Sequence, residues 1–291
     1  MKNYFLLLPI IFIITISGCT SFVETGNGIV IKNFEPEFNP AFSTEDVNFL
    51  VRIKNTGSFR TTNGELQLIG LEEWGPSSPN EPNCLEGFSM QAPDAFYGVD
   101  GETKQCTFTL RAPDVPTTLT RTYDPYLRVH YDYHSSTVKS VTIFSRDELV
   151  RYQNQNKPLP TDHISSTRGP ININLDTQAP IVALQTQVIF PLTIEVRNDG
   201  GGVVCIQRNC KDSTQQNKLL LNLFLGRDMA SECDNLELSI PRGQSNTIVC
   251  KITVSNIPTF GFIKKTIEVN ADYSYFVEKQ ASITIQSKPV S

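Results

Sequence analysis

The sequence repeats itself once, and this repeat is the feature that most constrains the fold. Residues 53–57 and 196–200 both close an alternating segment with a turn, and they match at an offset of 143 residues. Later segments match in the same order, and Tyr131 and Tyr133 fall on Tyr273 and Tyr275 at an offset of 142. A period of this length is too long for a solenoid unit. The chain is therefore predicted to contain two domains built on one plan.

Both copies have the alternation of β-strands. Residues 267–275 alternate strictly between apolar and polar side chains, and residues 127–134 do the same. A period of two places one face of a strand inward and the other in water. Each copy has about seven such segments separated by turn signals, which is the size and spacing of a β-sandwich. The predicted fold class is all-β, with antiparallel sheets.

The first 18 residues are predicted to be a signal peptide. Residues 4–17 carry no charge, and as a helix they would span roughly 21 Å, short of the roughly 30 Å hydrocarbon core. The run ends in Ile16-Ser17-Gly18-Cys19, which resembles the lipobox of prokaryotic lipoproteins. That resemblance implies cleavage before Cys19 and a lipid on its thiol. The alternatives are an uncleaved short anchor and ordinary secretion.

The remaining chain divides into four predicted parts. They are a lipid-anchor tether at 19–26, a first sandwich domain at 27–145, a linker at 146–168 and a second sandwich domain at 169–291. Ser145 and Glu148 form a capping-box pattern, which predicts a short helix at the start of the linker. Pro158 and Pro160 with their polar neighbours indicate that the rest of the linker is irregular.

The chain has seven cysteines, and Cys19 is left over when the other six are divided between the copies. An exported chain meets an oxidising environment, so disulfides are expected. Pairing within each copy leaves three arrangements, because the first copy has two cysteines and the second has four. The repeat selects one arrangement, since Cys106 is equivalent to Cys250, and Cys84 and Cys233 follow the same strand. The predicted bridges are Cys84–Cys106, Cys233–Cys250 and Cys205–Cys210.

Metal binding is the rival interpretation of these residues. The cysteine spacings lack the paired C-x2-C knuckles of zinc sites. His130, Asp132 and His134 share the outward face of one strand, so they are either a surface metal site or a solvated strand face. Neighbours on that face are roughly 6.6 Å apart, and the second copy does not repeat the trio. We predict no metal and no other cofactor.

Charge and motifs argue against two classes of function. The net charge of -5 does not suit a nucleic-acid-binding protein, which needs a basic face. The chain has no G-x-S-x-G elbow, and residues 200–202 lack the Lys-Ser/Thr ending of a phosphate loop. We therefore expect no enzyme, and a hydrolase with an unrecognised site is the third functional hypothesis.

Large apolar side chains gather in the segment between Cys84 and Cys106. They are Phe88, Met90, Phe96 and Tyr97. On a loop such side chains mark an interaction surface, or they fold back to cover the end of a sheet. Trp74 presents the same two alternatives. These four residues are the candidate contact with a partner.

The turns at 53–57 and 196–200 and the later Y-x-Y strands resemble immunoglobulin-like modules of prokaryotic surface proteins, in particular the CARDB-like group. The resemblance covers residues 27–145 and 169–288, and it implies two tandem immunoglobulin-like antiparallel β-sandwiches. Such modules mostly lack catalytic residues and are associated with adhesion and surface assembly. The implied role is a lipid-anchored, non-catalytic structural, adhesion or assembly protein at the cell surface or in the periplasm, with an envelope protein as partner. The alternative is a surface or periplasmic lipoprotein that captures a ligand.

Overall fold

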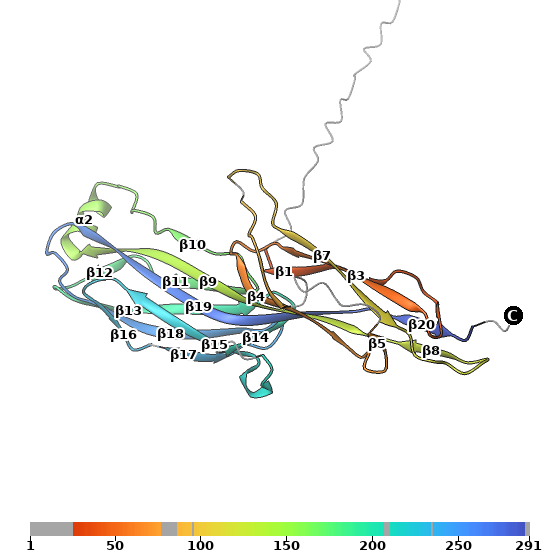
Figure 1. Cartoon of the computed structure of the whole chain (residues 1–291). Helices are drawn as coiled ribbons and strands as arrows, with labels where there is room; N and C mark the ends of the chain where they lie inside the picture. Colours follow the sequence, from red (N-terminus) through yellow and green to blue (C-terminus); the bar gives the residue numbers. More distant parts are fainter. Residues whose placement is uncertain (1–25, 77–85, 95, 207–209, 234, 289–291) are drawn as a thin grey trace, which may run out of the picture.

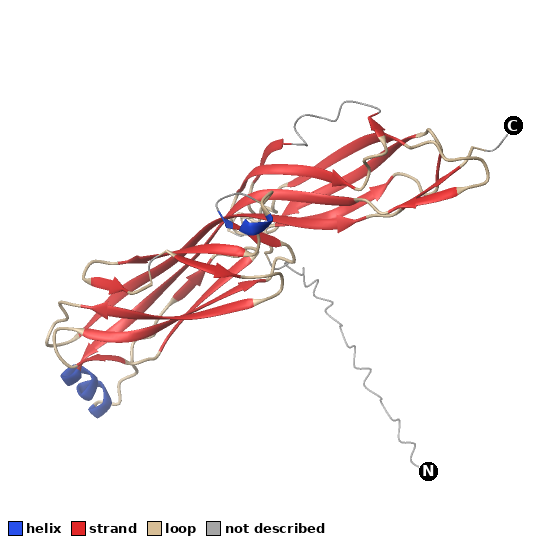
Figure 2. Cartoon of the chain, turned by 90° about the horizontal axis from the view of Figure 1, so that it is seen from below, coloured by secondary structure: helices blue, strands red, loops and turns tan. Residues whose placement is uncertain are grey.

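The protein is described from a computed structural model, which covers residues 26–76, 86–94, 96–206, 210–233 and 235–288. It is nearly all β with several antiparallel sheets, which confirms the predicted all-β sandwich class. Two lobes joined end to end form one elongated molecule (Figures 1 and 2). The first lobe holds most strands of the first repeat, and the second lobe holds most strands of the second repeat and the helix α2.

The strands of the first repeat are β1 (Ile29–Pro36), β2 (Ala41–Phe42), β3 (Asp46–Asn55), β4 (Thr61–Ile69), β5 (Gly75–Pro76), β6 (Glu86–Met90), β7 (Thr103–Arg111), β8 (Thr120–Tyr123) and β9 (Tyr126–Ser145). The connection and the second repeat contain α2 (Arg146–Asn154), β10 (Ile164–Ser166), β11 (Ile171–Thr177), β12 (Ile181–Ala183), β13 (Val188–Asn198), β14 (Val203–Cys205), the 3-10 turn η2 (Ser213–Gln215), β15 (Lys218–Leu225), β16 (Met229–Ser231), β17 (Leu236–Ser239), β18 (Ser245–Val254), β19 (Phe262–Gln280) and β20 (Ile283–Gln286).

Both lobes share a central sheet, and besides it the first lobe has two sheets of its own and the second lobe has one. The smaller sheet of the first lobe has the order β2-β20-β8. The order of the larger sheet is β1-β3-β7-β5 in the first lobe, and the sheet of the second lobe has the order β11-β13-β18-β16. The shared sheet has the path β17-β15-β19-β9-β4-β6. Buried side chains from all four sheets form one continuous apolar core that runs through both lobes.

The two longest strands cross from one lobe into the other. β9 has 20 residues and β19 has 19, and they pair antiparallel from Tyr126↔Gln280 to Phe144↔Phe262. β9 begins beside β4 and ends beside β10 and β12. β19 begins beside β15, and the strand after it, β20, pairs with β8 and β2 in the first lobe. The chain of the first repeat therefore extends into the second lobe along β9, and the chain of the second repeat extends into the first lobe along β19 and β20.

The predicted domain boundaries at 145 and 169 divide the chain into consecutive segments, whereas each lobe contains strand segments from both repeats. The second half of β9 belongs to the sheet of the second lobe, and β20 belongs to the first lobe. Leu127 and Ile143, at the two ends of β9, are in phase and both lie in the core. The apolar–polar alternation lapses between them, where Ser135, Thr137 and Lys139 take the inward phase. This lapse does not by itself show that the strand passes into another lobe.

The helix predicted at the start of the linker is present. α2 begins after the N-cap Ser145, whose Oγ accepts a hydrogen bond from the backbone N of Glu148 at 3.3 Å. This is the contact that the capping-box pattern predicted. Within the described ranges, no helix has both the length and the apolar character needed to span a membrane.

Cutting the connection between the repeats tests the strand exchange. Residues 155–159 are exposed and carry no strand, so a protease site inserted there can be cleaved in the folded protein. We expect the two fragments to elute together from a size-exclusion column in native buffer, because separating them would break the whole β9–β19 ladder. The same fragments should separate in concentrated guanidinium. Fragments that separate in native buffer would contradict the exchange.

Candidate functional site

The junction of the lobes is centred on the pair Asp132 and Ser274. These two residues lie directly opposite each other in the β9–β19 ladder, and the pairs Tyr131↔Tyr275 and Tyr133↔Tyr273 flank them. The repeat maps Tyr131 onto Tyr273 and Tyr133 onto Tyr275, so exchanging the repeats exchanges the two flanking pairs. A pseudo-twofold axis therefore passes through the Asp132–Ser274 pair.

The four tyrosines pack around this axis and are all buried. Ring centroids are 5.8 Å apart for Tyr131 and Tyr275 and 6.2 Å apart for Tyr133 and Tyr273. The hydroxyls of Tyr133, Tyr273 and Tyr275 form hydrogen bonds at the junction, whereas the buried Tyr131 hydroxyl has no hydrogen-bond partner among the described residues. Tyr133 Oη donates to the carbonyl of Arg168 at 2.7 Å and accepts from the backbone N of Phe59 at 3.0 Å.

The second repeat makes the corresponding contacts. Tyr275 Oη donates to Asn198 Oδ1 at 2.6 Å and accepts from the backbone N of Gly202 at 2.8 Å. Burial raises the pKa of Tyr133 to about 12, and it raises the pKa of Tyr131, Tyr273 and Tyr275 above the ordinary tyrosine value. All four phenols are therefore neutral at physiological pH and able to donate hydrogen bonds.

Asp132 is the acceptor of a buried polar network at the axis. Its Oδ1 accepts a short hydrogen bond from Ser274 Oγ, and its Oδ2 accepts from Asn63 Nδ2 at 2.6 Å. Both Asp132 and Ser274 are buried. A hydroxyl that donates to a buried carboxylate is held in place, so the arrangement suits a structural contact.

The two histidines near Asp132 do not converge with it. His134 Nδ1 lies 2.8 Å from Asp272 Oδ1, while the ring of His130 packs against that of Phe276 at a tilt, with ring centroids 5.2 Å apart. Burial, with a smaller contribution from the charge of Arg128, lowers the pKa of His130 to about 4, so its imidazole is neutral at pH 7. Within the described residues, no group of three His, Cys, Asp or Glu side chains is arranged to hold a metal ion.

Two of the three predicted disulfides are present in the structure. They are Cys205–Cys210 and Cys233–Cys250, with Cα atoms 5.2 Å and 5.7 Å apart. Cys106 is also disulfide-bonded, and Cys84, its predicted partner, lies outside the described residues. Cys19 lies outside them as well. Chains that pass through an oxidising compartment carry such bridges.

The candidate partner contact divides into two buried and two exposed residues. Phe88 and Met90 lie on β6 in the core, so their assignment to a contact surface is corrected. The ring of Phe88 packs on Gly64 of β4, where an added Cβ would lie 2.3 Å from a ring carbon. Trp74 is also buried, with its ring centroid 5.7 Å from Phe49 and 5.6 Å from Tyr123.

Phe96 and Tyr97 remain exposed, at 88% and 75% of their surface. They form, with Val99 at 56%, what we call the aromatic tip, at the end of the loop that stands away from the middle of the molecule before β7 (Figure 1). The rings of Phe96 and Tyr97 meet edge to face, 5.0 Å apart. Val99 carries no sequence signal of exposure, because nothing in the local pattern distinguishes it from a core residue.

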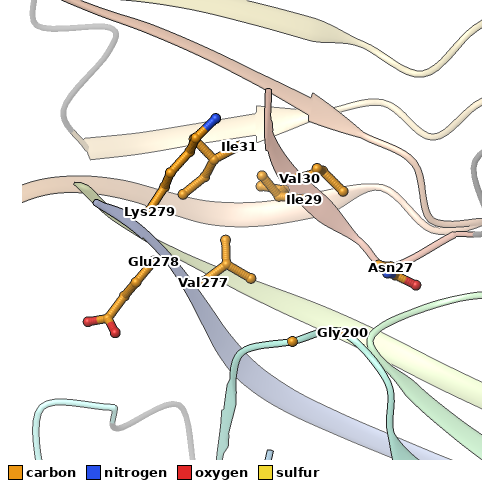
Figure 3. Close-up of a pocket in the computed structure, with 9 residues that line it drawn as sticks. Asn27, Ile29, Val30, Ile31, Gly200, Val277, Glu278 and Lys279 are labelled. Atoms are coloured by element: carbon orange, nitrogen blue, oxygen red, sulfur yellow. The ribbon is translucent and has the colours of Figure 1, made fainter. Parts of the chain in front are cut away.

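A pocket of about 230 Å³ lies beside the junction (Figure 3). Three separate segments line it: the start of β1 with Asn27, the turn Gly200-Gly201, and the end of β19 from Val277 to Lys279. A second pocket, of about 420 Å³, lies over β1, β3 and β7 and includes Lys32, Glu35 and Arg52. No sequence signal pointed to either pocket, because the residues that form them are far apart along the chain.

Replacing Asp132 tests the structural assignment of the junction. We expect Asp132→Ala to lower the free energy of unfolding by about 2–3 kcal/mol, since it leaves the buried Ser274 hydroxyl and the Asn63 amide without their acceptor. The matched control is Asp272→Ala, because the Asp272 side chain is 64% exposed, and its loss should cost less than about 1 kcal/mol. Urea unfolding measures both. Equal effects of the two substitutions would contradict the assignment.

No protein-family model matches the chain, and no curated protein matches it. The immunoglobulin-like and lipoprotein resemblances therefore rest on the sequence patterns alone. What the chain does must be argued from the junction, the aromatic tip and the pockets.

Proposed function

We propose that this protein is an exported, lipid-anchored, non-catalytic envelope protein that holds a protein partner through the aromatic tip. Its two lobes act as one rigid spacer of CARDB-like, immunoglobulin-like sandwiches, with a structural, adhesion or assembly role. The lipid on Cys19 attaches the spacer to a membrane. The exposure of Phe96 and Tyr97 is the observation that carries the assignment of a partner.

The backbone of the aromatic tip is fixed before any partner arrives. Asp94 and Val99 exchange two backbone hydrogen bonds of 2.8 Å and 2.9 Å. Asp94 Oδ1 accepts from the backbone N of Phe96 at 2.9 Å and of Tyr97 at 3.2 Å. Large aromatic side chains on an ordered loop lose little conformational entropy on binding, and aromatic residues dominate the energetic centres of protein interfaces.

Two observations support a role without catalysis. The Ser274 hydroxyl and the Asp132 carboxylate bond each other in a buried network, which leaves neither open to a substrate. The pocket at the junction has about 230 Å³, below the usual range of small-molecule sites, roughly 300–1,000 Å³, whereas the pocket over β1, β3 and β7, with about 420 Å³, lies within it. The junction therefore supports neither a hydrolase site nor the capture of a ligand there.

Export is supported by the disulfides. Cys205–Cys210 and Cys233–Cys250 both lie within the second repeat, and disulfides are rare in reducing compartments. The six cysteines other than Cys19 are all assigned to bridges by the repeat, which leaves Cys19 free to carry the lipid.

Photo-crosslinking in intact cells tests the assignment of the aromatic tip. A benzophenone amino acid at position 97 should give one discrete crosslinked product, and Phe96→Ser should reduce that product about ten-fold or more, as loss of an aromatic hot spot does. The control position is Phe260, an aromatic residue of the second lobe that is 76% exposed. If positions 97 and 260 give the same products, or neither gives any, the aromatic tip is not the contact.

The lipid anchor has its own test. An alkyne-labelled fatty acid fed to cells that make the full-length chain should label the protein, and Cys19→Ser should abolish the label, because the thiol is the proposed attachment point. Membrane association is followed in parallel by washing the membranes with carbonate. A wild-type protein that stays unlabelled and uncleaved would identify the N-terminal run as a simple anchor.

A further inference from the structure

The strand β10 has no counterpart among the described strands of the first lobe. In the second lobe, β10 pairs with the outer edge of β9, with Ile164 opposite Lys139 and Ser166 opposite Thr137. The residues after β10 continue the contact. The backbone N of Thr167 donates to the carbonyl of Ser136 at 2.9 Å, and Ser58 and Arg168 are hydrogen-bonded to each other.

The pseudo-twofold axis relates this edge of β9 to the end of β19. β14 pairs with β19 as far as Phe276. Beyond that point, no strand of the described part of the chain pairs with the outer edge of β19. An uncovered strand edge presents free backbone N–H and C=O groups to any chain that can add to it.

The pseudo-twofold axis relates the pocket beside the junction to the position that β10 and the residues after it occupy in the second lobe. Ser166 and the two residues after it contact Ile173, Thr137, Ser136 and Ser58. The repeat maps these four residues onto Ile31, Lys279, Glu278 and Gly201, and all four line the pocket. Figure 3 shows the side chain of Lys279 on β19 extending toward Ile31 of β1, while the side chain of Glu278 points away from β1.

The chain carries a sequence that corresponds to β10 at the required position. Ile164 and Thr167 map onto Phe22 and Thr25 at the offset of 142, so an apolar residue and a threonine recur. Residues 22–25 also lead directly to Asn27, which lines the pocket. The C-terminal end of this segment is therefore joined directly to the pocket, so the segment needs no long loop to reach the outer edge of β19.

We propose that residues 22–25 add to the outer edge of β19 as an antiparallel strand and fill the pocket beside the junction. The register of β10 places Phe22 opposite Ala281, Val23 opposite Gln280 and Glu24 opposite Lys279. The carboxylate of Glu24 then faces the ammonium of Lys279. Backbone pairing gives the affinity and these side chains fix the register, as in β-strand addition by peptides.

The proposed strand does not require lipidation, so it can be tested apart from the proposed function. Cys19 lies three residues before the proposed strand. The next step rests on the proposed function, in which Cys19 carries a lipid. At roughly 3.3 Å per residue, the first lobe is then held within about 10 Å of its lipid. The anchor would be connected to the β-structure by a paired strand in place of a free tether.

Disulfide trapping in the full-length chain tests this proposal. Glu24→Cys with Lys279→Cys, in a Cys19→Ser background, should form an intramolecular disulfide, because the corresponding residues Ser166 and Thr137 have side-chain oxygens 3.0 Å apart. The control pair is Thr20→Cys with Lys279→Cys, which a free tether would join equally well. Peptide mapping under non-reducing conditions measures both yields, and we expect the first to exceed the second about ten-fold, as for a protected local structure.

Two results would overturn the proposal. Equal yields of the two pairs would mean that the segment moves freely, and a disulfide-linked dimer would mean that a second copy supplies the strand. Hydrogen exchange on the unsubstituted chain is the second measurement, in which the amides of Val23 and Thr25 should exchange at least about ten-fold slower than in an unstructured peptide. Exchange of both amides at the unstructured rate would also rule out the strand.

Discussion

The antiparallel ladder between β9 and β19 is the interaction on which the rest of the structure depends. Strands in globular proteins usually have between three and ten residues, whereas β9 has 20 and β19 has 19. Their length lets one pair of strands serve both sandwiches, so the lobes share a sheet and a core. Tandem domains joined by a linker normally move relative to each other. Here such motion would break backbone hydrogen bonds at the centre of a sheet, and the protein is better described as one elongated body.

The symmetry of the ladder imposes a chemical condition at its centre. A residue on the pseudo-twofold axis faces its own counterpart from the other repeat, as Asp132 faces Ser274. Two aspartates at this position would place two buried carboxylates in contact, and such a pair cannot easily be ionised at both sites. A serine opposite the aspartate supplies a donor instead. The tyrosines beside the axis need no such difference, because neutral aromatic rings pack against each other without a charge penalty.

Features that the two repeats do not share are the best guides to function. The aromatic tip belongs to the first repeat, while the Cys205–Cys210 clasp belongs to the second. Among the described strands, the outer edge of β19 beyond Phe276 is a third difference, since the matching edge of β9 carries β10. The clasp and this edge lie at the junction of the lobes, since β14 pairs with β19 up to Phe276 and residues 277–279 line the pocket there.

The sequence by itself determined the two-copy plan, the all-β class, the helix at Ser145 and the pairing of Cys233 with Cys250. Each of these follows from a local pattern or from comparing the repeats, and such patterns survive in any arrangement of the strands. The tertiary structure alone decided that the chain of each repeat extends into the lobe of the other, because a period of two is the same whether a strand stays in its lobe or crosses to the next. It also separated Phe96 and Tyr97 from Phe88 and Met90, since burial depends on which distant surface, such as Gly64, lies opposite a side chain. The pocket at the junction could not be foreseen for the same reason: its residues meet only after the strands have crossed.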